Sequence, residues 1–471
     1  MILPVRLEVA TAAPRTGVAA SARRVNLPVS ALTALVLGLG FVHLGAKSVW
    51  LDESISVGQA TKQGVWVTLT GRGDNMGLHS FLLHFWIKAF GESEIAIRSL
   101  SVFFAALCVP AVYLTGRRLF DRRAGLVAAV LLAPNAFFLQ WAQQARGYTL
   151  LILLVTLSSY FFLGELEHPS RANRLAYVVS SAAALDAHYF AAFVVLAQLL
   201  TVLALRRRAA FTKSWLGVAA AIAVLGLPEA IHALDTGAAQ LSWIASPNGA
   251  SLRKALLDLG GGGWPALAVV SAGCGFALLR AVRIRDRWRE CFLAAWLAVP
   301  VVLSFAASFI QPMFLSRYLL VSLPALVLLA ARGLTKLPSP ALLAALVAAA
   351  CASGLQVSDW YGAPAREDWR AATRYVLAST HPGDAVLYYP TYAQTPFGYY
   401  ERMDGARAGG PAATHPQPDT NPRVWLVVRK EDAVRDPRGL QTLEQALASG
   451  YGISRQRSFS GVQVALYTRQ A

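Results

Sequence analysis

Long apolar runs that carry almost no charge at their centres recur through the first three quarters of the sequence. Within a bilayer a segment must satisfy its own backbone hydrogen bonds, and runs of this length without alternating polar residues do so only as helices. We therefore predict a membrane all-α fold, a polytopic bundle of about 11 transmembrane helices. The predicted spans lie near residues 29–46, 97–116, 124–140, 148–164, 174–187, 189–206, 214–232, 264–281, 291–310, 317–334 and 340–357.

The charged residues support this reading and exclude nucleic acid as a partner. Only 15% of the residues are charged, against roughly 25% in soluble domains. The net charge of +17 comes mostly from arginines clustered between apolar runs, where topology-setting charges lie. The four cysteines all fall within apolar stretches and show neither CxxC nor Cys/His spacing, so neither a zinc site nor a disulfide framework is indicated.

The positions of these arginines also predict the topology. Arg15, Arg23 and Arg24 precede the first run, which is long enough to be an uncleaved anchor with a cytoplasmic N-terminus. The arginine-rich loops near 117–123, 206–213 and 280–289 then all fall inside. An odd number of crossings places the tail outside, which divides the chain into a cytoplasmic tail (1–28), a membrane domain (29–357) and an extracytoplasmic domain (358–471).

That tail differs in character from the rest of the chain. It mixes helix-like runs (EDWRAATRYVLAS, LQTLEQALA) with strand-like runs (DAVLYYP, RVWLVV, VQVALYT), separated by a Gly/Pro-rich stretch at 405–422. At about 110 residues it can bury a core of its own, so we predict a small α/β domain.

Two further segments are predicted outside. The segment 47–94 contains LHSFLLHFWIKAF, too short to span the bilayer and expected to lie along its surface. The segment 233–263, with SWIASPNG and a GGGG run, is predicted to be a mobile loop suited to substrate entry.

The sharpest candidate for chemistry is W-L-D-E-S at 50–54, directly after the first span. Two adjacent carboxylates, Asp52 and Glu53, at a membrane surface can raise one pKa towards the value that a general base needs. Asp74 adds a third carboxylate further along the same segment. The alternative is a pair at a helix terminus solvated by headgroup water.

Other polar residues fall at predicted outside junctions. Arg146 and Tyr148 in QQARGY, and Arg317 in PMFLSRY, offer donors for a phosphate or, alternatively, anchors at the membrane interface. His188 and Tyr189 in DAHYF are candidate substrate-site residues. A lone histidine there is more often packed than a ligand, and the sequence leaves a divalent metal ion open.

The motifs WLDES, GDNMGLHSFLLHFW, FGESEIAIRSLS, GRRLFDRRAG, QARGYTLL and SRYLLVSLPAL occur in an order that resembles the GT-C superfamily of integral-membrane glycosyltransferases. The resemblance covers roughly residues 40–335 and is nearest to the branch of protein O-mannosyltransferases and the lipid A aminoarabinose transferase. It implies that Asp52, with Glu53 beside it, carries the catalytic base, and that Arg146, Tyr148 and Arg317 hold the donor phosphate. Many members have His-Pro-Pro-Leu-Tyr where this chain reads Asn75 to His79, so Asp74 is only a suggestion.

The resemblance implies transfer of a hexose or pentose from a polyprenyl-phosphate donor to a glycan, lipid or protein acceptor, by inverting displacement on the extracytoplasmic face. The lack of a convincing GxGxxG after a strand is consistent with a lipid-linked donor. A transporter or lipid-linked-sugar flippase is the main alternative, but it predicts midplane charges and repeated halves, which we do not detect. A non-catalytic scaffold is a third.

Overall fold

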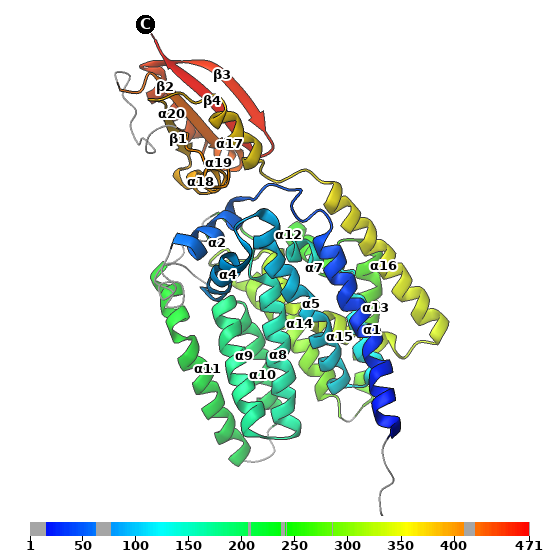
Figure 1. The fold of residues 1–471 in the computed structure, drawn as a ribbon. Helices are drawn as coiled ribbons and strands as arrows, with labels where there is room; N and C mark the ends of the chain where they lie inside the picture. The colour runs from blue at the N-terminus through cyan, green and yellow to red at the C-terminus, as the bar shows by residue number, and fades with distance from the viewer. Residues whose placement is uncertain are drawn as a thin grey trace, which may run out of the picture.

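The structure is a computed structural model that describes residues 16–62, 77–205, 209–236, 241, 243–284, 286–408 and 420–470. A large body of helices carries a small domain with a sheet at one end, and α16 leads from the first to the second (Figure 1). The segments α2, α4 and α12 lie at the end of the helical body that faces the small domain (Figure 1).

The helices of the body coincide with the apolar runs and the segments between them. They are α1 (Thr16–Phe41), α2 (Leu51–Lys62), α4 (Gly77–Phe90), α5 (Glu94–Leu119), α6 (Arg122–Leu132), α7 (Ala136–Ala142), α8 (Tyr148–Glu167), α9 (Arg171–Ala187), α10 (Ala191–Ala204), α11 (Ala209–Thr236), α12 (Gly249–Gly260), α13 (Trp264–Val282), α14 (Trp288–Ala307), the 3₁₀ helix η2 (Ser316–Ser322), α15 (Leu323–Leu334) and α16 (Ser339–Gly362).

Each of the predicted spans overlaps one or two of these helices, and the multi-pass helical class is confirmed, but the number of eleven crossings is not. By length and hydropathy, 7 described helices can cross a membrane, or 8 if α6 and α7, which are bent by 66° relative to one another, form one span. The apolar parts of α1 and α10 are shorter than a full crossing. The count of eleven stays a prediction, because length and hydropathy do not decide whether a short apolar helix spans the membrane or is re-entrant.

The prediction of a loop at 233–263 is wrong for residues 249–260, which form the helix α12. This helix begins with a capping box: the Asn248 side chain accepts from the Ser251 N–H, and the Ser251 hydroxyl accepts from the Asn248 N–H. Gly261, at φ 114°, ends the helix in the left-handed region. The glycine run that indicated a loop thus marks only a helix terminus.

Small residues let two membrane helices come into backbone contact. A Cβ atom placed on Gly333 of α15 would lie 1.9 Å from the carbonyl oxygen of Gly273 in α13. Such close approach is how helices pack where lipid removes the hydrophobic force between them.

The C-terminal α/β domain is as expected in its main elements. Its elements are α17 (Trp369–Leu377), β1 (Ala385–Tyr389), η3 (Thr391–Ala393), α18 (Gln394–Met403), β2 (Arg423–Arg429), α19 (Lys430–Arg435), α20 (Pro437–Ala448), β3 (Tyr451–Phe459) and β4 (Val462–Arg469). The sheet has the order β1-β2-β4-β3, with β1 and β2 parallel and the other pairs antiparallel.

One hydrophobic core joins this domain to the helical body. It combines residues of α2, α4, α5 and the adjoining segments with residues of the sheet, α17 and α18. Its members include Val49, Val57, Leu83, Ile97, Trp369, Val376, Phe397, Trp425 and Val464. The α/β domain is therefore packed on the helices that carry the WLDES motif, not merely tethered to them.

Candidate active site

Two cavities open where the helical body meets the α/β domain, and both are lined by Trp50, Arg317 and Arg366. The larger has a volume of about 480 Å³ and the smaller about 370 Å³. The three shared residues line both cavities and so lie where the two adjoin, and we call this place the partition.

Asp52 and Arg317 meet at this partition. Asp52 lies in the first turn of α2, and its Oδ2 is 3.4 Å from Nη2 of Arg317, which belongs to η2. The Arg317 side chain is only 13% exposed and packs among four aromatic rings, those of Trp50, Trp141, Trp243 and Tyr318. Its buried Nε has no hydrogen-bond partner among the described residues, so the guanidinium keeps donor capacity for a ligand.

Glu53, the neighbour of Asp52, lies in a different environment. Its side chain is fully buried and paired with Arg98, with Nη2 to Oε2 and Nε to Oε1 both at 2.7 Å. Its carboxylate also accepts from the backbone N–H of Ala145 at 2.9 Å and of Trp50 at 3.3 Å. A carboxylate with this many donors joins α2 to α5 and to the start of the QARGY motif.

Arg146 contacts α2 from the side. Its Nη1 donates to the Asp52 carbonyl at 3.0 Å and to the Ser56 hydroxyl at 2.8 Å. Tyr148 is buried next to Trp141, His188 and Tyr318. Both residues line the larger cavity together with Asp52 and Arg317, so the structure brings four of the predicted site residues together.

His188 lines the same cavity, whereas Tyr189 is not among the lining residues. Burial and the nearby arginines lower the pKa of His188 to about 3, so its ring is neutral. The Nδ1 of His188 accepts from the Phe190 N–H, and its buried Nε2 has no partner among the described residues. Asp74 lies outside the described residues.

The cavity is also lined by residues that were not predicted as site residues. His79 of α4 lies in the GDNMGLHSFLLHFW motif but was assigned no role, and burial lowers its pKa to about 3. Ser56 of α2 lies outside the motifs. The α/β domain covers the larger cavity with residues that belong to no motif, which are Arg366, Tyr392, Arg429, Glu431 and Arg435. Only the fold places this domain over the site.

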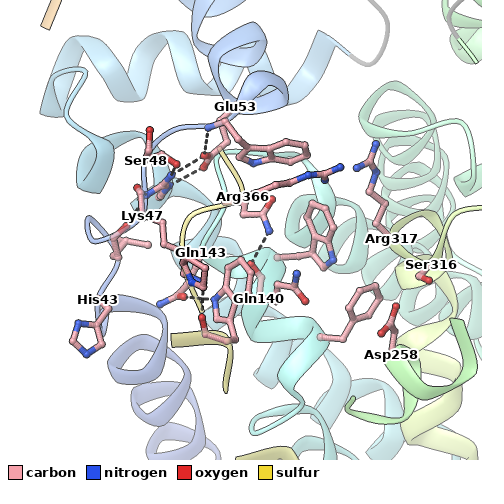
Figure 2. Close-up of a pocket in the computed structure, with 18 of the residues that line it drawn as sticks. His43, Lys47, Ser48, Glu53, Gln140, Gln143, Asp258, Ser316, Arg317 and Arg366 are labelled. Carbon is pink, nitrogen blue, oxygen red and sulfur yellow. Dashed lines mark hydrogen bonds and ion pairs between the residues drawn. The ribbon is translucent and has the colours of Figure 1, made fainter. Parts of the chain in front are cut away.

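The smaller cavity combines aromatic, amide and cationic side chains. Lys47 and Glu53 lie on one wall, Arg317 lies on the opposite wall, and Gln140 and Gln143 lie between them (Figure 2). Burial, and then the charge of Arg98, lower the pKa of Lys47 to about 8. The remaining lining includes Leu44, Phe137, Trp141, Leu315 and Trp360, which suit an apolar chain.

The described residues include no group of three or more His, Cys, Asp or Glu side chains placed to hold a metal ion.

Comparison with known proteins supports the assignment of the fold. Residues 77–232 match the family of dolichyl-phosphate-mannose-protein mannosyltransferases. The structure is similar to ArnT from Cupriavidus metallidurans bound to undecaprenyl phosphate, with a TM-score of 0.62 at 13% identity, over 94% of this chain and 98% of that one.

Two larger proteins are also similar. The archaeal oligosaccharyltransferase AglB from Archaeoglobus fulgidus, in complex with an inhibitory peptide and a dolichol-phosphate, gives a TM-score of 0.56 at 11% identity, over 94% of this chain and 74% of that one. Arabinofuranosyltransferase AftD from Mycobacteria gives 0.50 at 15% identity, over 95% and 42% of the two chains. No curated protein sequence matches this chain.

Proposed function

We propose that this chain, which has the GT-C fold of integral-membrane glycosyltransferases, transfers a sugar from a polyprenyl-phosphate-linked donor to an acceptor on the extracytoplasmic face of the membrane. The observation that carries the proposal is the contact of Asp52 with Arg317 at the partition between the two cavities. A base and a phosphate-binding cation then meet at the place where two substrates can be brought together.

The chemistry is a single displacement. The Asp52 carboxylate takes the proton from an acceptor hydroxyl or amine, whose lone pair attacks the anomeric carbon. The bond from that carbon to the phosphate oxygen breaks, and the polyprenyl phosphate leaves with the electron pair, so the configuration inverts. The leaving group is already an anion, and Arg317 stabilises it electrostatically, which lowers the need for a strong general acid.

The linings of the two cavities support the binding of the donor lipid in one cavity and of the acceptor in the other. The smaller cavity, with aromatic side chains and the cations Lys47 and Arg317, suits the isoprenoid and its phosphate. The larger cavity, with Asp52, Ser56 and the cover provided by the α/β domain, suits the acceptor and the sugar. The resemblance implies that Arg146 and Tyr148 hold the donor phosphate together with Arg317. In the arrangement proposed here they lie on the acceptor side instead, and Arg146 orients the helix that carries Asp52.

The experiment that tests the proposal is transfer of radiolabelled sugar from a panel of polyprenyl-phosphate donors in membranes that contain the native chain, Asp52→Asn or Asp359→Asn. We expect native transfer, and a loss of at least about 100-fold in Asp52→Asn because the base is removed. Asp359 is an exposed carboxylate of α16 that lines neither cavity, so its variant controls for the change of charge.

Transfer that survives in Asp52→Asn would remove Asp52 from the role of base. If the native chain transfers sugar from no donor in the panel, the enzyme function itself is wrong, and a transporter or flippase becomes the better explanation.

A further inference from the structure

The α/β domain holds the four residues that precede Asp52. The backbone N–H of Val49 donates to the Tyr400 hydroxyl at 2.7 Å, and the Ser48 hydroxyl donates to the same oxygen at 3.1 Å. The Ser48 hydroxyl in turn accepts from the Arg370 N–H at 3.1 Å. The segment between the first span and α2 is thus fixed from α17 and α18, elements of the other domain.

Glu367 makes the last of these contacts, at the N-terminus of α2. Its Oε2 accepts from the backbone N–H of Leu51, the first residue of α2, at 3.1 Å and from Trp369 Nε1 at 2.7 Å. Its Oε1 accepts from Arg429 Nε at 2.8 Å, and the Glu367 and Arg429 side chains are 2% and 6% exposed. A buried carboxylate at this position satisfies a free helix N–H and interacts favourably with the helix dipole.

The residue before Glu367 contacts the residue before Leu51. The Arg366 guanidinium lies 5.0 Å from the centre of the Trp50 ring, and it donates to Glu431 at 3.1 Å. Glu431 also accepts from Arg429, the partner of Glu367. Arg366 and Glu367, in the linker to the α/β domain, therefore contact Trp50 and Leu51 at the start of α2. Arg429 at the end of β2 and Glu431 of α19 hold this linker in place.

These contacts bear on catalysis because Asp52 directly follows the held segment. The distance between the Asp52 carboxylate and Arg317 depends on where α2 begins, and Glu367 fixes that point. Misplacing a reacting group by about 1 Å can cost about 100-fold in rate.

We propose that Glu367 is a positioning residue for Asp52, through which the α/β domain sets the geometry of the catalytic centre. This inference rests on the proposed function. Glu367 touches neither the donor nor the acceptor, and its effect passes through the Leu51 N–H and the first turn of α2.

The test compares Glu367→Gln with Asp384→Asn. Asp384 is also a buried carboxylate, 1% exposed. It forms an ion pair with an arginine (Arg423) and accepts hydrogen bonds from a tryptophan Nε1 (Trp425) and a backbone N–H (His381), but all these partners lie within the α/β domain. The two variants remove the same charge from the same kind of cluster, and only one cluster reaches α2. Tyr400→Phe, which removes the hydroxyl next to Val49 from a different helix, is a second probe of the same segment.

In purified full-length protein, we expect Glu367→Gln to lower kcat by about tenfold to 100-fold while KM for the donor stays within about twofold. We expect Tyr400→Phe to act in the same direction and Asp384→Asn to leave kcat within about twofold. Native kcat in Glu367→Gln, or an equal loss in Asp384→Asn, would overturn the proposal.

Hydrogen–deuterium exchange of the peptide that contains residues 48–56 gives a readout that does not depend on activity. We expect faster exchange in Glu367→Gln and Tyr400→Phe than in the native chain or Asp384→Asn. Unchanged exchange would overturn the positioning role even if the chain transfers sugar. Changed exchange in a chain that transfers no sugar would instead place the error in the proposed function.

Discussion

At the scale of single residues, the neighbouring carboxylates Asp52 and Glu53 lie in different environments. Asp52 is partly exposed and faces Arg317 in a cavity, whereas Glu53 is fully buried in an ion pair with Arg98. The sequence placed both in one motif and made both candidates for catalysis. It could not separate them, because Arg98 lies 45 residues away and only the packing of α5 on α2 brings it to Glu53. We propose that Asp52 acts on the substrate and that Glu53 holds α2 in place.

The protonation of Lys47 leads to a prediction about how kcat/KM for the donor depends on pH. Its pKa is lowered to about 8, so the side chain is charged below that pH and loses its proton as the pH rises through it. If Lys47 faces the donor phosphate, kcat/KM for the donor falls above pH 8, by about tenfold for the loss of one charge-assisted contact. Lys47→Arg keeps the charge and is expected to move this fall to higher pH.

The pH profile of kcat/KM measured for both chains checks this prediction. The same alkaline fall in the native chain and in Lys47→Arg would show that another group is responsible. Retention of the profile in Lys47→Met would exclude Lys47 from the donor site.

At the scale of elements, the apolar runs predicted the positions of the membrane helices because each run has to satisfy its own backbone in lipid. The same argument could not count the crossings, since α6 and α7 divide one predicted span with a bend of 66°. It also missed α12, whose start depends on a local hydrogen-bond exchange between Asn248 and Ser251 and not on apolar periodicity. Helix caps and bends depend on contacts between a few atoms, so composition and apolar periodicity do not predict them.

The contact between α13 and α15 allows a prediction about stability. We expect Gly333→Ala to destabilise the bundle by about 1 to 3 kcal/mol, because its methyl group would meet the Gly273 carbonyl and push the helices apart. Gly275→Ala, in α13 with open space at the Cβ position, is the control. Thermal unfolding of the detergent-solubilised protein measures both, and equal unfolding temperatures for the two variants would contradict the prediction.

At the scale of the whole molecule, the α/β domain completes the site. The sequence indicated a small domain after residue 357 but gave no motif within it, and the residues that it contributes to the larger cavity have no common spacing. They could not be identified without the fold, because the domain reaches α2 and α4 through a shared core between segments far apart in the chain.

Removing residues 363–471 therefore has a clear expected result. The shortened chain loses the contacts of Tyr400 and Glu367 with the start of α2 and exposes the apolar surface of α2 and α4. We expect transfer to fall at least 100-fold, about the loss caused by misplacing a reacting group, while the chain still inserts into the membrane. Transfer assays on membranes with matched protein abundance check this, and native transfer by the shortened chain would show that the domain is dispensable.

The contacts at the start of α2 also have a consequence for biosynthesis. Leu51 and Glu367 are 316 positions apart, and Val49 and Tyr400 are 351 apart. The ribosome makes the segment that carries Asp52 early and makes its supports last. The helices before α17 are therefore synthesised before the contacts that hold the start of α2 can form, and these contacts form only after the final quarter of the chain has been translated and folded. We expect chains that lack this final quarter to be inactive, so that the order of synthesis prevents incomplete chains from acting.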